Sequence, residues 1–184
     1  MMVYTSLFSA LIAAGAYVFI PIGPVPIVLQ NMFVFLAGLL LPVRWAFTCV
    51  GVYLLAGSCG LPVFAGGLGG IARLIGPTGG YLIGYLPAVY VIGKVVKRTG
   101  PSVYTDVTAM VCGSVILYAC GLWWLKILTA MTWSKTLAVG LYPFLIGDGL
   151  KIAAAAAISR ALRPIIGVSG SVSRDARFDR VLGE

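Results

Sequence analysis

Two ionisable side chains stand three residues apart in an otherwise apolar segment near the C-terminal end of the sequence. The segment reads FLIGDGLKIAAAAAIS, and its charged residues are Asp148 and Lys151. A spacing of three places both on one face of a helix. Asp148 lies about eleven residues into the predicted helix, roughly 16 Å along its axis and so near the middle of a bilayer. An Asp there costs on the order of 3 kcal/mol, which disfavours contact with lipid.

The pair is therefore predicted to face the inside of a helix bundle, as part of a functional site. Together the two groups offer one hydrogen-bond acceptor and one donor in a dry environment. That combination suits a small ligand that carries both N–H groups and a carbonyl or carboxylate. The alternative is an ion pair that serves only the structure.

A third charged candidate is Arg73, which is the only charge in the glycine-rich stretch GSCGLPVFAGGLGGIARLIG. A guanidinium can hold a carboxylate through two parallel hydrogen bonds, which makes Arg73 a candidate for binding an acidic ligand. An Arg reaching toward lipid headgroups is an equal alternative. The following GPTGGY, residues 76–81, could present free backbone N–H groups to an acceptor. The four-residue spacing of Gly76, Gly80 and Gly84 favours helix packing instead.

Polar amides and small residues mark two further helices. Gln30 and Asn31 lie inside an apolar stretch, where they either bond a neighbouring helix or line a pocket. Ala10 and Ala14 form a small-xxx-small pattern that gives a smooth face for another helix, within the chain or from a partner.

Enzyme, metal and nucleic-acid functions find little support. The sequence has no His, and Asp106 and Asp148 are its only acidic residues before residue 167. No Ser or Cys has an identifiable general base. The four Cys form no CxxC pair and are predicted to be free thiols. The net charge of +8 lacks the aromatic interleaving of single-strand binders and is assigned to loop anchors at the membrane surface.

The elements that position these residues follow from composition. Of the 184 residues, 60% are hydrophobic and 10% are charged, against about 25% charged in soluble domains. We predict an all-α, polytopic transmembrane bundle of six helices, at about residues 3–20, 27–41, 43–56, 77–96, 103–125 and 137–162. Residues 61–76, between the third and fourth helices, are predicted to be irregular and to form a lid or pocket wall. Residues 1–166 form the membrane domain, and residues 167–184 a polar tail.

The positions of Lys and Arg predict the orientation. Six spans place both termini on one side, with nine basic residues there and three on the other. The nine are Arg44, Lys94, Lys97, Arg98, Arg160, Arg163, Arg174, Arg177 and Arg180, and the three are Arg73, Lys126 and Lys135. Basic residues gather on the cytoplasmic side, so both termini are predicted to be cytoplasmic.

The sequence resembles the BioY family, the biotin-binding S-components of energy-coupling-factor transporters. The resemblance is carried by LPVFAGGLGGIARLIGPTGGYLIGY, PVPIVLQNMFVFLAGLLLP and DGLK, and covers about residues 7–159. It implies a multi-pass protein of the bacterial cell membrane that binds biotin from the outer side. It also implies a transmembrane coupling protein and two cytoplasmic ATPases as partners, with ATP used by those partners and no cofactor in the chain itself.

The resemblance assigns roles to individual residues. Asp148 and Lys151 would bind the ureido group of biotin, and Lys151 alternatively its carboxylate. Arg73 would hold the carboxylate, with Tyr81 beside the rings and Gln30 as a further ligand contact. A small-residue face at Ala10 and Ala14 would meet the coupling protein. The rival hypotheses are an S-component for another small carboxylate vitamin, a small integral membrane enzyme, and a scaffold protein whose charges are structural.

Overall fold

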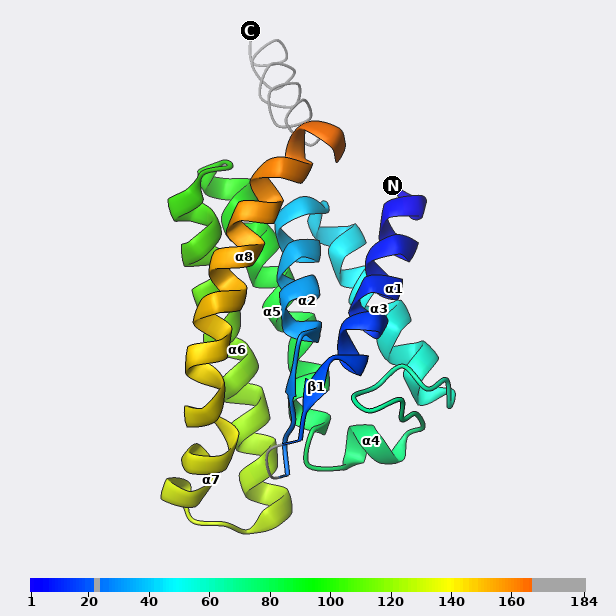
Figure 1. Ribbon diagram of the computed structural model, residues 1–184, viewed down its shortest axis with the longest axis vertical. Helices are drawn as coiled ribbons and strands as arrows, with labels where there is room; N and C mark the ends of the chain where they lie inside the picture. The colour runs from blue at the N-terminus through cyan, green and yellow to red at the C-terminus, as the bar shows by residue number, and fades with distance from the viewer. Residues whose placement is uncertain (22–23, 167–184) are drawn as a thin grey trace, which may run out of the picture.

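Six main helices, arranged as a bundle, make up most of the part of the chain that the computed structural model describes, residues 1–21 and 24–166 (Figure 1). They are α1 (Met2–Tyr17), α2 (Gln30–Leu40), α3 (Val43–Ser58), α5 (Gly79–Thr99), α6 (Val103–Thr129) and α8 (Tyr142–Ile166). Two short helices, α4 (Ala72–Ile75) and α7 (Trp133–Gly140), lie in the connections. The predicted all-α, six-helix membrane fold is confirmed. The predicted polar tail, residues 167–184, lies outside the described residues.

Hydropathy divides the helices into two groups. The helices α5 and α6 and the stretch Trp133–Ile166 are long and apolar enough to cross a membrane, whereas α1, α2 and α3 are apolar but shorter. The outer surface is strongly apolar, as Ile146 and Leu150 on α8 illustrate with exposed fractions of 82% and 71%. Apolar side chains exposed in this way belong in lipid, where they need no further burial.

The short helix α2 is the centre of the bundle. Nine of its eleven residues are buried, and it packs against α1, α3, α5 and α8. A helix that is apolar on all sides lies either in a protein core or in lipid. The contacts of α2 with four other helices place it in the core.

The helices α5 and α6 pack closely because α5 carries glycine where they meet. A Cβ on Gly80 would come within 2.2 Å of Cβ of Trp124, and one on Gly84 within 3.1 Å of Cβ of Cys120. Gly76 precedes the helix, and its carbonyl oxygen accepts a hydrogen bond of 2.9 Å from Nε1 of Trp124. The predicted packing role thus holds for Gly80 and Gly84.

A β-hairpin joins α1 to α2, where the sequence predicted that the first helix would run to residue 20 and the second would begin at residue 27. The antiparallel strands β1 (Phe19–Ile20) and β2 (Ile27–Val28) pair Phe19 with Val28 and Ile20 with Ile27. Pro21, Pro24 and Pro26 lie between these strands. Proline removes a backbone donor and disfavours helix at the preceding residue, so neither helix extends into this segment.

The predicted sixth helix is broken at Leu141, whose φ of −129° and ψ of −60° are not helical. Gly140 and Pro143 flank the break, and proline disfavours helix at the residue before it. As a result α8 begins at Tyr142, and Asp148 lies only about 9 Å along it. The break places Asp148 nearer the start of its helix than the sequence predicted, and the position of Asp148 near the middle of the bilayer stays a prediction.

The glycine-rich segment is irregular, as predicted, apart from α4. Its backbone is packed against the bundle, since the Gly70 amide donates to the Gly57 carbonyl oxygen at 2.7 Å. Phe64 anchors it with an exposed fraction of 1%, filling space where a Cβ on Gly57 would come within 2.2 Å of its ring. Irregular backbone can persist at membrane depth because its polar groups are satisfied within the protein.

Candidate functional site

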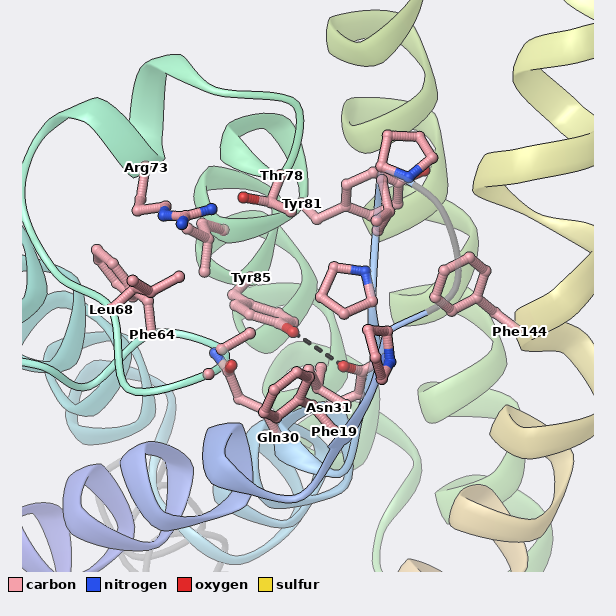
Figure 2. Close-up of a pocket in the computed structure, with 18 of the residues that line it drawn as sticks. Phe19, Gln30, Asn31, Phe64, Leu68, Arg73, Thr78, Tyr81, Tyr85 and Phe144 are labelled. Carbon is pink, nitrogen blue, oxygen red and sulfur yellow. Dashed lines mark hydrogen bonds between the residues drawn. The ribbon is translucent and has the colours of Figure 1, made fainter.

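A cavity of about 330 Å³ opens at the end of the bundle that holds the β-hairpin and α4, opposite the N-terminus (Figures 1 and 2). Its walls come from the hairpin, the first turn of α2, the glycine-rich segment, and the helices α5, α6 and α8. Segments that are far apart in the sequence therefore come together to form the cavity. A cavity of this size accommodates a small molecule.

Most of the wall is apolar. The hairpin contributes three prolines and Phe19, the glycine-rich segment contributes Phe64 and Leu68, and α8 contributes Phe144. Phe64 is held in place by an edge-to-face contact with Tyr53, at 5.6 Å between ring centroids. The polar residues that line the cavity are fewer, and they are Gln30, Asn31, Arg73, Thr78, Tyr81, Tyr85 and Tyr118.

Arg73 supplies the positive charge at the exposed side of the cavity. It lies on α4, lines the cavity and remains exposed to the surroundings. Figure 2 shows its guanidinium turned inward, toward Thr78. It takes part in neither of the two ion pairs found among the described residues. An unpaired guanidinium beside a small cavity is suited to a carboxylate.

A buried hydrogen-bond network lies at the opposite, inner end of the cavity. Oδ1 of Asp148 accepts from Nζ of Lys151 at 2.9 Å and from Nδ2 of Asn31 at 3.5 Å. Its other oxygen, Oδ2, accepts from the hydroxyl of Tyr118. The Tyr85 hydroxyl donates to Oδ1 of Asn31 at 2.9 Å (Figure 2). Four elements, α2, α5, α6 and α8, meet in this network.

The ion pair of the network lies one residue behind the cavity wall. Asp148 and Lys151 are 4% and 8% exposed, and neither is among the residues that line the cavity. Asn31 and Tyr118 stand between the carboxylate and the cavity. The predicted pairing of Asp148 with Lys151 on one helix face is present, and hydrogen bonds to Asn31 and Tyr118 connect it to the cavity wall.

The structure places the other predicted ligand contacts, Gln30 and Tyr81, on the cavity wall. Gln30 is 1% exposed, and its Nε2 makes no hydrogen bond within the described part of the chain. The hydroxyl of Tyr81 donates to the carbonyl oxygen of Gly140 at 2.8 Å. Tyr81 therefore presents its ring to the cavity while its hydroxyl holds the end of α7.

Sequence reasoning missed Tyr85 and Tyr118 as site residues and left Asn31 undecided. Tyr85 lies one helical turn beyond Tyr81, so a shared face of α5 was the available signal. No comparable signal exists for Tyr118, because an isolated tyrosine in an apolar helix resembles any core aromatic residue.

A second buried ion pair lies far from the cavity, near the end of α8. Nη2 of Arg163 is 2.5 Å from Oδ1 of Asp106, and Oγ of Ser159 donates to Oδ2 at 3.0 Å. This pair joins the start of α6 to the last turns of α8. It satisfies two charges that would otherwise be costly at this depth.

The small residues of α1 divide between two faces. Ala10 and Ala14 are exposed on the outer surface of the bundle. Gly15 and Ala16 are buried, and a Cβ on Gly15 would lie 2.7 Å from the ring of Phe33. The inner face therefore packs within the chain, while the outer one is free for another helix.

Comparisons with known proteins give a consistent result. A family model described as the BioY family matches residues 1–167. The "Biotin transporter BioY" of Thermotoga maritima is 38% identical over 164 residues, which cover 89% of this chain and 96% of that protein. The "Biotin transporter BioY" of Rhizobium etli is 37% identical over 172 residues, covering 88% and 91%.

A solved structure is also similar. It is described as the crystal structure of the S-component for biotin from an ECF-type ABC transporter. It matches with a TM-score of 0.83 and 33% sequence identity, over 89% of this chain and 90% of that one. The likeness therefore extends over the bundle as a whole.

Proposed function

This chain belongs to the BioY family, and from that membership we propose that it is a membrane subunit that binds biotin for uptake. The observation that carries the proposal is the cavity, which has Arg73 at its exposed side and the Asp148 network at its inner end. Biotin is a small molecule with a carboxylate at one end and a ureido ring at the other. The polar groups of the cavity are thus distributed as those of biotin are.

In this proposal the two ends of biotin meet different chemistry. Arg73 pairs with the valerate carboxylate, and the ureido group enters the inner end, whose charge comes from Asp148 and Lys151. The ring of Tyr81 and the apolar wall enclose the fused rings, and Gln30 adds a polar contact. Burial of the rings against such a wall contributes about 25 cal/mol per Å² of apolar surface.

The sequence contains no Walker A motif, so any ATP used for transport would be bound by partner proteins. We propose that a transmembrane coupling protein and two cytoplasmic ATPases supply the energy. The exposed Ala10 and Ala14 form the face that meets the coupling protein. We propose that the N-terminus lies in the cytoplasm. Because the cavity is at the opposite end of the bundle, it would then open to the outside, where biotin is taken up.

The proposal is tested by calorimetric titration of the purified protein with biotin and with a neutral biotin amide. Saturable binding of biotin is expected, with weaker binding of the amide because Arg73 loses its partner. The rival hypothesis is that the ligand is another small carboxylate vitamin. It is tested by titrating the protein with such vitamins and by measuring whether they displace biotin. Absence of saturable biotin binding by folded protein would overturn the proposal.

A further inference from the structure

A pair of exposed tryptophans marks the surface where α6 ends and α7 begins. The side chains of Trp123 and Trp133 are 63% and 47% exposed, and their ring centroids are 6.3 Å apart. Figure 1 shows this connection at the end of the bundle opposite the N-terminus. Trp123 lies twenty residues after Val103, the first residue of α6, or about 30 Å along the helix, which equals the thickness of a hydrocarbon core. The two rings therefore lie where a membrane meets water, a depth at which tryptophan is enriched.

A lysine places its charge against this pair. Nζ of Lys126 lies 5.0 Å from the centroid of the Trp133 ring and donates to the Met131 carbonyl oxygen at 3.4 Å. Within the described part of the chain the acidic residues are Asp106 and Asp148, and each is paired with a different cation. An ammonium group has three N–H donors. Two donors of the partly buried Lys126 thus remain for a group outside the protein.

An apolar stripe runs along the outer surface of α6 toward this charge. Its residues follow one another at intervals of four, so that neighbours in the stripe adjoin on the helix surface, and all of them are exposed. They are Val111, Val115, Ala119 and Trp123. From Val111 to Trp123 the stripe is about 18 Å long, close to half of a hydrocarbon core of about 30 Å. The stripe therefore has the length and the chemistry to contact the acyl chain of a lipid in one leaflet.

A cation at the end of an apolar stripe is complementary to an anionic phospholipid, whose phosphate stands at the end of its acyl chains. We propose that this surface binds one such lipid, with the headgroup phosphate on Lys126 and an acyl chain along the stripe. The exposed indole N–H groups of Trp123 and Trp133 are further donors to the headgroup. The inference concerns the outer surface of α6 and does not depend on the ligand of the cavity.

Two features favour an anionic lipid over a zwitterionic one. Aromatic rings attract the quaternary ammonium of a choline headgroup, but the Trp133 ring already carries the ammonium group of Lys126, which would repel it. Lys135, exposed in the first turn of α7, adds a second positive charge to this end of the bundle. Charge at the site thus selects for a headgroup with a net negative charge.

Native mass spectrometry measures this selectivity. Purified protein is equilibrated in detergent with equal amounts of phosphatidylglycerol and phosphatidylcholine, and the bound lipids are identified by mass. The unmodified protein is expected to hold phosphatidylglycerol over phosphatidylcholine by about fivefold, the effect of one lysine near an anionic headgroup. In Lys126→Gln this ratio should fall close to one. Equal retention of the two lipids by the unmodified protein would overturn the inference.

Lys135→Gln is the matched control, because it removes the same charge nine residues further along the chain. It should keep the preference within about twofold of the unmodified protein, since diffuse surface charge is screened. In Trp133→Leu the preference should fall, because Lys126 loses the ring that it contacts. If Lys135→Gln lost as much preference as Lys126→Gln, the attraction would belong to the surface as a whole and the site would be refuted.

Inorganic phosphate distinguishes a lipid site from a site for the phosphate ion alone. Excess inorganic phosphate should displace no more phosphatidylglycerol than sodium chloride does at the same ionic strength, because a free ion leaves the apolar stripe uncovered. Displacement by phosphate beyond that of chloride would show that the phosphate group by itself is the ligand, and the assignment of a lipid would be wrong.

Discussion

The charged residue on the cavity wall and the two behind it differ in whether an opposite charge neutralises them. Asp148 and Lys151 neutralise each other at 2.9 Å while buried. Arg73 is exposed and takes part in neither ion pair of the described residues. The cavity therefore has one uncompensated positive charge, on its open side. In the proposed function, this charge selects the single carboxylate of the ligand.

Replacement of Arg73 should remove selection for the carboxylate. We expect Arg73→Ala to weaken biotin binding about tenfold, a modest loss because the guanidinium is exposed and screened. Binding of the neutral biotin amide should hardly change. Titration calorimetry with both ligands measures this, with Arg44→Ala at the opposite end of the bundle as the control. An Arg73→Ala protein that still prefers biotin over the amide would assign the carboxylate to another residue.

Loss of Lys151 should destabilise the protein as well as its site. Lys151→Ala leaves the buried carboxylate of Asp148 without its ion-pair partner, which costs about 3–5 kcal/mol in buried pairs. The double variant Asp148→Asn, Lys151→Met removes both charges and should recover most of that stability without recovering biotin binding. Thermal unfolding in detergent compares the two. Equal stability of the single and double variants would show that the carboxylate does not need its partner.

In the sequence, the charged residues of the candidate site stand out more clearly than the neutral ones. Asp148, Lys151 and Arg73 could be found because charge is rare and costly in an apolar segment. Tyr118 could not, because its place in the network depends on a hydrogen bond to Asp148, 30 positions away in the sequence. Even the position of Asp148 behind the wall follows from such contacts. Chemistry of this kind is visible only once the helices are packed.

At the scale of elements, apolar runs predicted where helices occur, and local backbone chemistry decided where they end. The start of α2 moved from residue 27 to Gln30 because the hairpin precedes it. The sixth helix divided at Leu141, between Gly140 and Pro143. Hydropathy does not locate the hairpin or the helix break, because apolar residues continue through both segments. The prolines and the glycine indicated the bends but not their geometry.

The contact between α5 and α6 depends on Gly80, and a larger residue there should separate the helices. A Cβ would lie 2.2 Å from Cβ of Trp124 and 2.7 Å from the Cys120 carbonyl oxygen. Neither atom is the end of a flexible side chain, so the helix backbones must move. We expect Gly80→Val to lower stability by about 1–3 kcal/mol, as overpacking does. Thermal unfolding in detergent is the measurement.

Gly51→Ala on α3 is the matched control for Gly80→Val, because a Cβ at Gly51 meets nothing within 4 Å. It should leave stability within about 0.5 kcal/mol of the unmodified protein. Biotin binding should also weaken in Gly80→Val, because the neighbouring Tyr81 lines the cavity. If Gly80→Val were as stable as Gly51→Ala, close packing would not be the reason for the glycine.

At the scale of the whole molecule, a buried carboxylate joins α6 to α8 at each of two positions along the bundle. Asp148 bonds Tyr118 beside the cavity, and Arg163 pairs with Asp106 near the other end. The helix α1 lies on the outside of the bundle and contacts α2 and α3. Its polar tie to α3 is the hydroxyl of Ser9, which donates to the Cys49 carbonyl oxygen at 2.9 Å. The small residues Ala10 and Ala14 lie on the exposed face of α1 and are not among the residues that line the cavity.

This separation predicts that partner binding and biotin binding can be lost independently. In Ala14→Trp, a bulky ring on the exposed face of α1 should prevent the close helix approach that small residues allow. Co-purification with the coupling protein should fall severalfold, while calorimetric binding of biotin by the isolated subunit stays within about twofold. The control is Val115→Trp on the outer surface of α6, where the side chain is 63% exposed.

If Val115→Trp also released the partner, or if Ala14→Trp retained it, the docking face would lie elsewhere. Loss of biotin binding in folded Ala14→Trp would instead show that α1 and the cavity are coupled within the subunit, because the added ring lies outside the cavity wall.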